Sequence, residues 1–162
     1  MMAVEEKTQP ARQKKLQTSK YELKNLKFLG DFMTALGLTT TTAAEKCGLT
    51  QVSVYYWLRK DDAHYSSVER LINAWGYKLK MELVSPEDQE TSIVVIDHPT
   101  EKRLAFLERA IAEAGRGEIQ KQLGIGNTTI YYWLTHDDIF ISYIFRIADI
   151  IGKKVKVTIS PM

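Results

Sequence analysis

The sequence predicts a mostly α-helical protein made of two copies of one small domain, each of which ends in a β-strand. The first observation is an internal repeat, because the segment Tyr-Tyr-Trp-Leu at 55–58 returns 76 residues later at 131–134. The second is the recurrence of apolar residues every three and four positions, which is typical of amphipathic helices. The third is a change to strict alternation at the end of each copy, which is the period of a half-buried strand.

Length and composition limit the class of protein. The chain has 162 residues, which is enough for two domains of about 80 residues each. Its 22 basic and 20 acidic side chains give a net charge of +2, which by itself indicates no partner. The single cysteine, Cys47, excludes an internal disulfide and any zinc site with several cysteines, so we expect a cytoplasmic protein. The basic N-terminus and the lack of a long apolar run predict no signal peptide and no membrane-spanning segment.

Charge and turn-forming residues divide the chain into four segments. Residues 1–20 have a net charge of +3 and few apolar side chains, so we expect a flexible basic arm. Residues 21–84 form the first domain and residues 101–162 form the second, each with a C-terminal strand. Residues 85–100 form an acidic linker, in which the β-branched run at 92–96 is a candidate third strand.

The first copy begins with two predicted helices. Apolar residues at helical spacing over 23–36 stop at Gly37, which predicts an amphipathic helix with a glycine at its end. Thr42 and Glu45 have the spacing of a capping box, which predicts a short second helix that ends at Cys47.

A third helix is expected after the tight turn at Gly48. Thr50 is positioned to cap this helix, which runs from residue 51 to about residue 59. Three of its positions are expected to face the core: Val54, Trp57 and Leu58.

A fourth helix and a strand complete the copy. Ser66 and Glu69 form a second capping box, which predicts a helix that ends at Gly76. Apolar and charged residues then alternate over 77–83, as they do over 155–159 in the second copy. Because a lone strand is not stable, we expect the two C-terminal strands to pair in a small shared sheet and to give a pseudo-two-fold arrangement.

The succession of helix, glycine turn and helix in both copies resembles the helix-turn-helix of the lambda-repressor and Cro type, also called the xenobiotic-response-element family. In the first copy the matching residues are Ala44, Gly48, Leu49, Val54 and Trp57. In the second copy they are Gly124, Ile125, Ile130 and Trp133. Gln120 departs from the pattern, because a small residue is usual at its position. The resemblance covers roughly 21–84 and 101–160, and it implies a sequence-specific DNA-binding protein, such as a repressor-like bacterial or phage transcriptional regulator.

In such a motif the third helix enters the major groove with its N-terminus first, so its first turn and outward face reach the bases. In the first copy these DNA-binding candidates are Thr50, Gln51, Val52, Tyr55, Tyr56, Arg59 and Lys60. In the second copy they are Asn127, Thr128, Tyr131, Tyr132 and Thr135. Thr135 cannot replace the charge of Arg59, so the two copies are expected to read unlike half-sites in adjacent major grooves. The candidate phosphate contacts are Arg12, Lys14, Lys15, Lys46 and Lys121.

Catalysis is not expected, and we assign no catalytic residue, metal site or cofactor, because the scattered histidines and the single cysteine match no ligand spacing. The aspartate pairs at 61–62 and 137–138 are expected to serve in loops and caps. The alternative function is a protein-interaction or assembly module on the same scaffold, including antitoxin-like partner binding. The apolar run at 139–145 would form a homodimer or partner interface if it is exposed.

Overall fold

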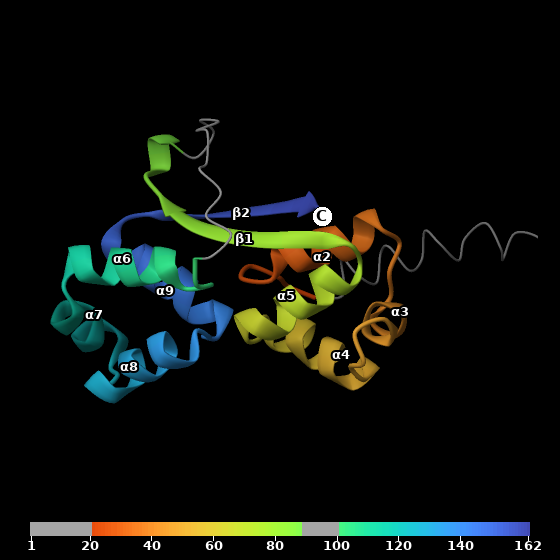
Figure 1. The fold of residues 1–162 in the computed structure, drawn as a ribbon, viewed down its shortest axis with the longest axis horizontal. Coiled ribbons are helices and arrows are strands. Elements are labelled where there is room, and N and C mark those ends of the chain that lie inside the picture. Colours follow the sequence, from red (N-terminus) through yellow and green to blue (C-terminus); the bar gives the residue numbers. More distant parts are fainter. Residues whose placement is uncertain (1–20, 89–100) are drawn as a thin grey trace, which may run out of the picture.

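The computed structural model describes residues 21–88 and 101–162, so the predicted arm (1–20) and the candidate strand at 92–96 lie outside the described residues. Eight α-helices and a two-stranded antiparallel sheet make the described part mostly α-helical, as predicted (Figure 1). Among the helices of these two ranges, none is long and apolar enough to cross a bilayer.

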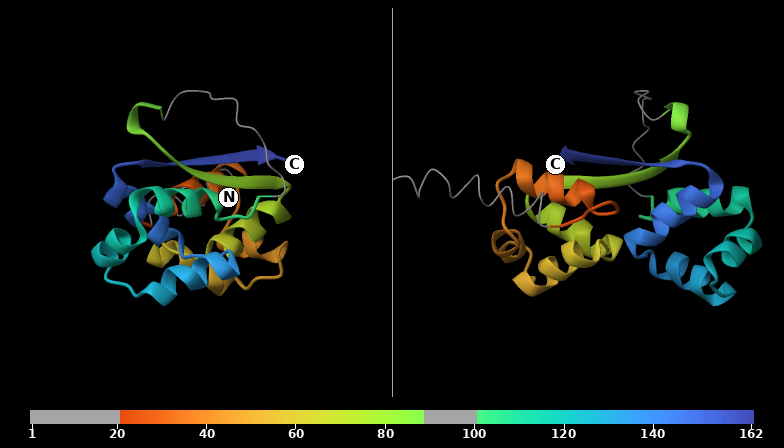
Figure 2. Two further views of the ribbon diagram at one scale, coloured as in Figure 1. Left: turned by 60° about the vertical axis from the view of Figure 1, so that its left-hand side comes forward. Right: turned by 180° about the vertical axis from the view of Figure 1, so that it is seen from behind.

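The two halves of the chain have the same order of elements, with four helices before each strand. The first half contains α2 (Lys27–Ala35), α3 (Thr40–Glu45), α4 (Gln51–Lys60), α5 (Tyr65–Ala74), β1 (Tyr77–Val84) and the 3-10 turn η1 (Pro86–Asp88). The second half contains α6 (Ala105–Ala114), α7 (Arg116–Leu123), α8 (Asn127–His136), α9 (Ile141–Ile151) and β2 (Lys154–Pro161). Figure 2 shows that the helices of both halves lie on one side of the sheet.

The sheet joins the two halves. β1 and β2 pair antiparallel over eight residues each, from Tyr77 opposite Pro161 to Val84 opposite Lys154. The predicted pairing of the two C-terminal strands is therefore confirmed. The side chain of Met81 is buried beneath the sheet, as the alternation along this strand predicts.

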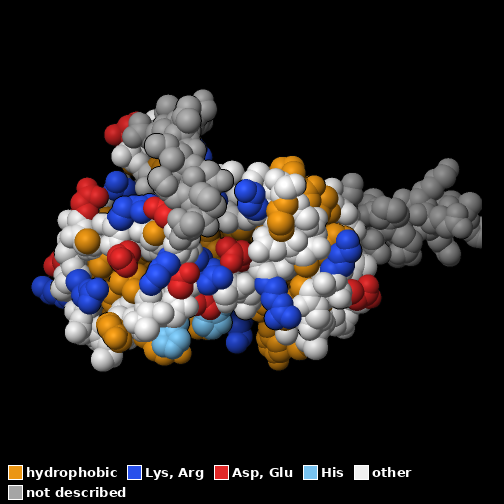
Figure 3. All heavy atoms as spheres, in the orientation of Figure 1, with side chains coloured by type: hydrophobic (Ala, Val, Ile, Leu, Met, Phe, Trp, Pro, Cys, Tyr) orange, Lys and Arg blue, Asp and Glu red, His pale blue; other side chains and the backbone are white. Residues whose placement is uncertain are grey.

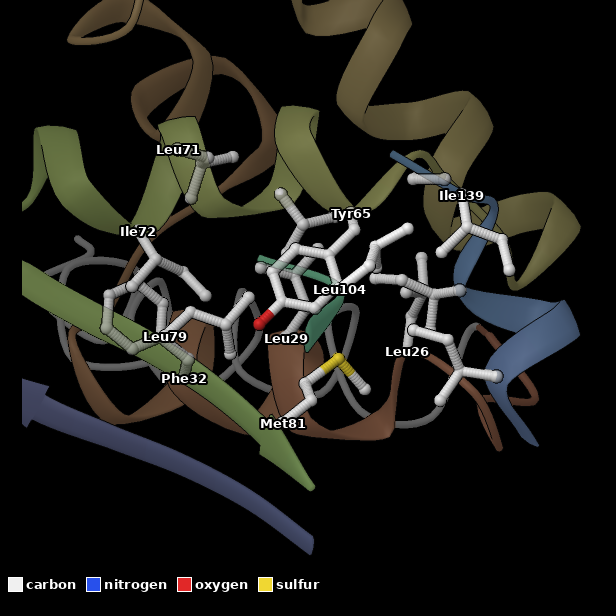
Figure 4. Packing of buried hydrophobic residues seen from close by; sticks show 14 of the residues in the cluster. Leu26, Leu29, Phe32, Tyr65, Leu71, Ile72, Leu79, Met81, Leu104 and Ile139 are labelled. Atoms are coloured by element: carbon white, nitrogen blue, oxygen red, sulfur yellow. The ribbon is translucent and has the colours of Figure 1, made fainter. Parts of the chain in front are cut away.

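One hydrophobic core includes residues of both halves. Leu26 and Tyr65 of the first half and Leu104 and Ile139 of the second half are all buried and belong to the same cluster. Figure 4 shows these side chains close together on the side of β1 that faces the helices. Because the core is shared, the two halves form one packed body rather than two independent units.

The loops after α4 and α8 meet at a junction between the halves. The N–H of Tyr65 donates to the carbonyl oxygen of Ile139 at 2.8 Å, and the N–H of Ile141 donates to that of Ala63 at 2.9 Å. The junction is therefore reciprocal, because each loop supplies the same kind of contact to the other.

Two aspartate–serine pairs strengthen this junction. The Asp138 carboxylate accepts from the N–H and the hydroxyl of Ser66, at 2.9 and 2.6 Å. The Asp62 carboxylate accepts in the same way from Ser142, at 2.9 and 2.7 Å. The loop and cap role expected for these aspartates is confirmed. The predicted capping box at Ser66 is wrong, because α5 begins after His64 without a local side-chain cap and the cap comes from the other half.

Asp61 and Asp137 hold the other side of the same loops. They end α4 and α8 in the left-handed conformation, with φ of 57° and 54°. Asp137 also accepts the backbone N–H of Leu104 at 2.8 Å. Asp61 accepts three N–H groups before α2: those of Lys24, Asn25 and Leu26. Each aspartate therefore ties the end of one helix to the start of another in its own half.

The first two helices begin at different residues from those predicted. α2 begins at Lys27, so Leu23 lies before the helix rather than inside it. The capping box of α3 is made by Thr39 and Thr42 rather than by Thr42 and Glu45. The Thr39 hydroxyl accepts the N–H of Thr42 at 3.1 Å, and the Thr42 hydroxyl accepts the N–H of Thr39 at 2.8 Å. The helix therefore starts three residues earlier than the sequence pattern indicates.

The apolar run at 139–145 does not form an exposed patch. Ile139, Ile141 and Ile144 are at most 1% exposed, because they face the shared core. Phe140 is the one large side chain of this run that is exposed, at 41%. The expectation of a homodimer or partner interface along this run is therefore corrected, since most of its apolar surface is internal.

Candidate nucleic-acid interface

A tight turn and a cap position the start of α4. Gly48 adopts φ of +70°, which favours glycine, and it reverses the chain between α3 and α4. The Thr50 hydroxyl then accepts the N–H of Ser53 at 3.2 Å, so α4 begins at Gln51. The predicted cap and helix start are both confirmed.

One face of α4 is buried and the other is open. Val54 and Leu58 are buried, whereas Trp57, which was expected in the core, is half-buried. Tyr55 is also half-buried, so Tyr56 is the outward tyrosine of this pair. The exposed candidates on and before this helix are Thr50, Gln51, Val52, Tyr56, Arg59 and Lys60.

Two cations lie in the last turn of α4. Arg59 donates from Nη1 to the hydroxyl of Tyr55 at 3.4 Å. Lys60 places Nζ 5.5 Å from the centre of the Tyr56 ring. Both side chains are exposed, and their charges stand beside the open face of the helix.

The open face of α8 is more aromatic than that of α4 and carries less charge. Its core side consists of the buried Ile130 and Trp133. Tyr131 and Tyr132 are 65% and 60% exposed, so both tyrosines of this half point outward. The other three candidates of this half are also exposed: Asn127, Thr128 and Thr135. No Lys or Arg occurs in α8.

The first residue of each of these two helices carries an amide that is held by the preceding helix. The Thr41 hydroxyl donates to Oε1 of Gln51. Gln120 donates from Nε2 to Oδ1 of Asn127 at 3.0 Å. Gln120 therefore positions the amide of α8. In both halves the amide oxygen is held, and within the part of the chain that the structure describes the amide NH₂ group has no hydrogen-bond partner, so it can donate to another acceptor.

His136 is a basic residue of this surface that the sequence analysis missed. It is exposed in the last turn of α8, and its ring stacks on Tyr132 with 3.8 Å between ring centres. The internal repeat could have identified His136, because the 76-residue offset aligns Tyr132 with Tyr56 and His136 with Lys60.

The candidate phosphate contacts occupy different places. Lys46 is exposed at the end of α3, with Nζ 4.6 Å from the centre of the Trp75 ring. Lys121 is exposed in the last turn of α7. Three further candidates, Arg12, Lys14 and Lys15, lie outside the described residues.

The two open faces belong to the same side of the molecule. Figures 1 and 2 show α4 and α8 at the edge of the helical layer farthest from the β1–β2 sheet. In Figure 3, hydrophobic and histidine side chains gather on this lower edge, close to Lys and Arg side chains. An extended partner that lies along this edge would therefore meet both helices.

Other polar groups of the described residues serve the fold. Burial raises the pKa of the Tyr65 phenol above its ordinary value of 10.0. Burial alone lowers the pKa of Arg103, but the hydrogen bonds and charge of Glu69 raise it overall. The Cys47 thiol is buried and donates to the carbonyl oxygen of Ala44 at 3.4 Å. Among residues 21–88 and 101–162, no group of three or more His, Cys, Asp and Glu side chains is placed to hold a metal ion.

A groove of about 650 Å³ lies between β1 and α6, away from α4 and α8. Its charged lining includes two ion pairs, Arg103 with Glu69 and Arg109 with Glu101, each at 2.8 Å. These pairs link neighbouring segments of the fold, and no residue of α4 or α8 lines the groove.

Comparison with known proteins identified no relative of this chain. No family model matches the chain, and neither the curated proteins nor the solved structures contain a match. Function is therefore inferred from the geometry and chemistry of α4 and α8.

Proposed function

We propose that the protein binds double-stranded DNA in a sequence-specific manner and acts as a repressor-like transcriptional regulator of a bacterium or phage. One observation carries the proposal: α4 and α8 lie on one side of a single packed body, and each leaves its first turn exposed (Figure 1). Successive major grooves on one face of B-DNA are about 34 Å apart, so two reading helices need a fixed separation. The shared sheet and core supply that rigidity.

In this proposal α3–α4 and α7–α8 are two helix-turn-helix units of the lambda-repressor type. The β1–β2 pair and the reciprocal contacts of Asp62 with Ser142 and of Asp138 with Ser66 support a pseudo-two-fold relation between them. A pseudo-two-fold pair of helices suits a bipartite site, because the two half-sites of a palindrome are related in the same way.

The amides at the two helix starts are the proposed base readers. Gln51 and Asn127 each have the chemistry that pairs with adenine, whose N7 accepts and whose N6 donates. Their oxygens are already held by Thr41 and Gln120, and each oxygen keeps a second lone pair for the adenine N6 donor. Since the amides are fixed before DNA arrives, less side-chain entropy is lost on binding.

The two half-sites are not expected to be equal. α4 has Arg59 and Lys60 in its last turn, whereas α8 has Thr135 and His136 at the matching positions. Each phosphate contact by a cation adds affinity and salt dependence. α4 is therefore expected to supply more of the binding free energy, and α8 to extend the site.

The test is selection from a randomised duplex library with the full chain, at two salt concentrations. The expected result is a bipartite site with unlike halves about one helical turn apart. Gln51→Ala with Arg59→Ala should weaken binding to that site by roughly 100-fold, because a base contact and a charge are both lost. Arg109→Ala removes the same charge from α6 and serves as the matched control. Failure to enrich any sequence would rule out a sequence-specific regulator.

A protein-interaction module is the second candidate, and one observation favours it. Tyr131 and Tyr132 are both largely exposed on a helix that lacks Lys and Arg, and tyrosine is enriched at protein interfaces. The selection separates the two candidates. A selected DNA sequence that contains only the half-site read by α4 would assign α8 to a protein partner. The variant Tyr131→Ala with Tyr132→Ala would then leave DNA affinity unchanged.

A further inference from the structure

The two copies share a basic position on their helices that the proposed function does not yet use. From Gly48 onward, where the offset between the copies is 76 residues, Lys and Arg match at three positions. Two of these positions lie on the paired strands: Lys78 matches Lys154, and Lys80 matches Lys156. The third is Arg70 in α5, which matches Arg146 in α9. A charge that both helical layers carry at the same place indicates a need that the two halves have in common.

Arg70 lies beside the turn that leads into α4. The residue is exposed, and its Nη2 lies 3.6 Å from the point where a Cβ on Gly48 would stand. Gly48 comes three residues before Gln51, the first residue of α4. When the first turn of a helix enters the major groove, the segment just before it lies close to the sugar–phosphate backbone that borders the groove. In the proposed complex the Arg70 guanidinium is therefore within reach of a strand that flanks α4.

Arg146 has the corresponding place beside α8. It is exposed, and its guanidinium carbon lies 5.3 Å from the centre of the Tyr143 ring. The centre of the Tyr143 ring lies 5.0 Å from that of Trp133, on the core side of α8. Arg146 thus stands next to the helix that has no Lys or Arg of its own. It would supply the positive charge that α8 lacks.

Neither guanidinium is neutralised by a carboxylate in the part of the chain that the structure describes. The ion pairs within residues 21–88 and 101–162 include neither Arg70 nor Arg146. Along α5, no residue three or four positions from Arg70 is acidic. In α9, the exposed Asp149 is three positions after Arg146, where α5 has Asn73. Residues at this spacing are neighbours on a helix, so we expect Arg146 to attract an anion less strongly than Arg70 does.

We propose that Arg70 and Arg146 are matched phosphate contacts, one beside each DNA-reading helix, which fix the position of the protein on the duplex. The inference rests on the proposed DNA-binding function and adds to it a contact that both halves share. A guanidinium can form two parallel hydrogen bonds with a phosphate, which an ammonium group cannot. Phosphate contacts carry no sequence information, so the two arginines contribute affinity for any duplex, whereas Gln51 and Asn127 distinguish one sequence from another.

The test is the salt dependence of binding by the full chain to a mixed-sequence duplex of about 30 base pairs. Loss of one phosphate contact lowers the slope of log K against log salt by about 0.9. Arg70→Gln should therefore lower the slope by about 0.9 and raise Kd roughly tenfold, since a charge-assisted hydrogen bond is lost. Arg146→Gln should lower the slope in the same way, with a smaller rise in Kd. The double variant should lower it by about 1.8, because contacts in separate halves add.

The chain offers matched controls for these variants. Lys80→Gln and Lys156→Gln also remove cations that match between the copies, but they lie on the sheet, on the side of the molecule away from α4 and α8 (Figure 1). Both should leave the slope unchanged. Arg70→Lys keeps the charge, so it should keep the slope and recover only part of the affinity. Both arginines are exposed, so every variant should unfold at the urea midpoint of the unmodified protein.

The outcomes separate this inference from the function on which it rests. An unchanged slope in Arg70→Gln and Arg146→Gln would overturn the matched contacts, and so would an equal fall in the two lysine controls. A slope that responds to one arginine alone would overturn the contact shared by both halves. In these cases DNA binding itself would stand. If the unmodified protein binds no duplex at any salt concentration, the DNA-binding function fails together with this inference.

Discussion

The junction between the two halves predicts a large loss of stability in Asp138→Ala. The Asp138 carboxylate accepts three hydrogen bonds, from the N–H of Ser66 at 2.9 Å, from its hydroxyl at 2.6 Å, and from the N–H of Ile139 at 3.0 Å. The substitution removes the acceptor and leaves these donors partly buried without a partner. Hydrogen bonds to a charged group contribute about 1.5–3 kcal/mol each when they are buried.

The magnitude follows from the exposure of this site. The Asp138 side chain is 25% exposed, so water replaces part of what is lost, and we take about 1 kcal/mol for each of the three bonds, below the range for buried ones. We expect Asp138→Ala to lower the free energy of unfolding by about 3 kcal/mol. Asp62→Ala should have a similar effect, because Asp62 makes the matching bonds to Ser142. Ser66→Ala removes only the hydroxyl and should cost about 1 kcal/mol.

Urea unfolding followed by circular dichroism measures these differences. Asp31→Ala is the matched control, because Asp31 is 61% exposed and its ion pair with Lys27 at 3.0 Å lies on the surface. Surface ion pairs contribute about 0–1 kcal/mol, so the control should change stability little. If Asp138→Ala behaves like Asp31→Ala, the reciprocal bonds do not stabilise the junction and the reasoning is refuted.

Two further predictions concern single residues. Burial raises the pKa of Tyr65, so the folded chain holds this proton more tightly than the unfolded chain. The contribution of this group to the free energy of unfolding is therefore intact below about pH 10, and it falls as the pH rises further. Tyr65→Phe should therefore lose less stability than the unmodified protein between about pH 9 and about pH 11, and equal urea-midpoint shifts would contradict this. Asp61→Gly relieves a left-handed φ of 57° but removes the acceptor for Lys24, Asn25 and Leu26. It should destabilise the protein by about 2 kcal/mol in thermal unfolding, and a rise in Tm would show that backbone strain dominates.

Features that depend on neighbouring residues could be predicted from the sequence. Thr50 caps α4 through Ser53, three residues away, and the alternation that ends at Leu83 identifies a strand. Contacts between distant residues could not be predicted in this way. Ser66 has the spacing of a local cap, but its partner is Asp138, 72 residues later.

The same contrast between local features and contacts of distant residues applies to the candidate site. Exposure of Gln51 and Tyr131 was predictable, because a helix with one apolar face presents its other face to solvent. The burial of the apolar run at 139–145 was not, since composition does not distinguish a shared core from an exposed interface. His136 was considered only as a metal ligand, so its stacking on Tyr132 was missed.

Both halves belong to one covalent chain and are held together by the pairing of β1 with β2, and under the proposed DNA-binding function this affects how occupancy of DNA responds to protein concentration. Two subunits that meet by association separate on dilution, so occupancy of a bipartite site falls with more than the first power of concentration. Two halves in one chain keep a constant effective concentration of each other. Occupancy should then follow a simple hyperbola at any abundance. Under the same proposal each half is free to change its own sequence preference, because a substitution in α4 is not copied into α8.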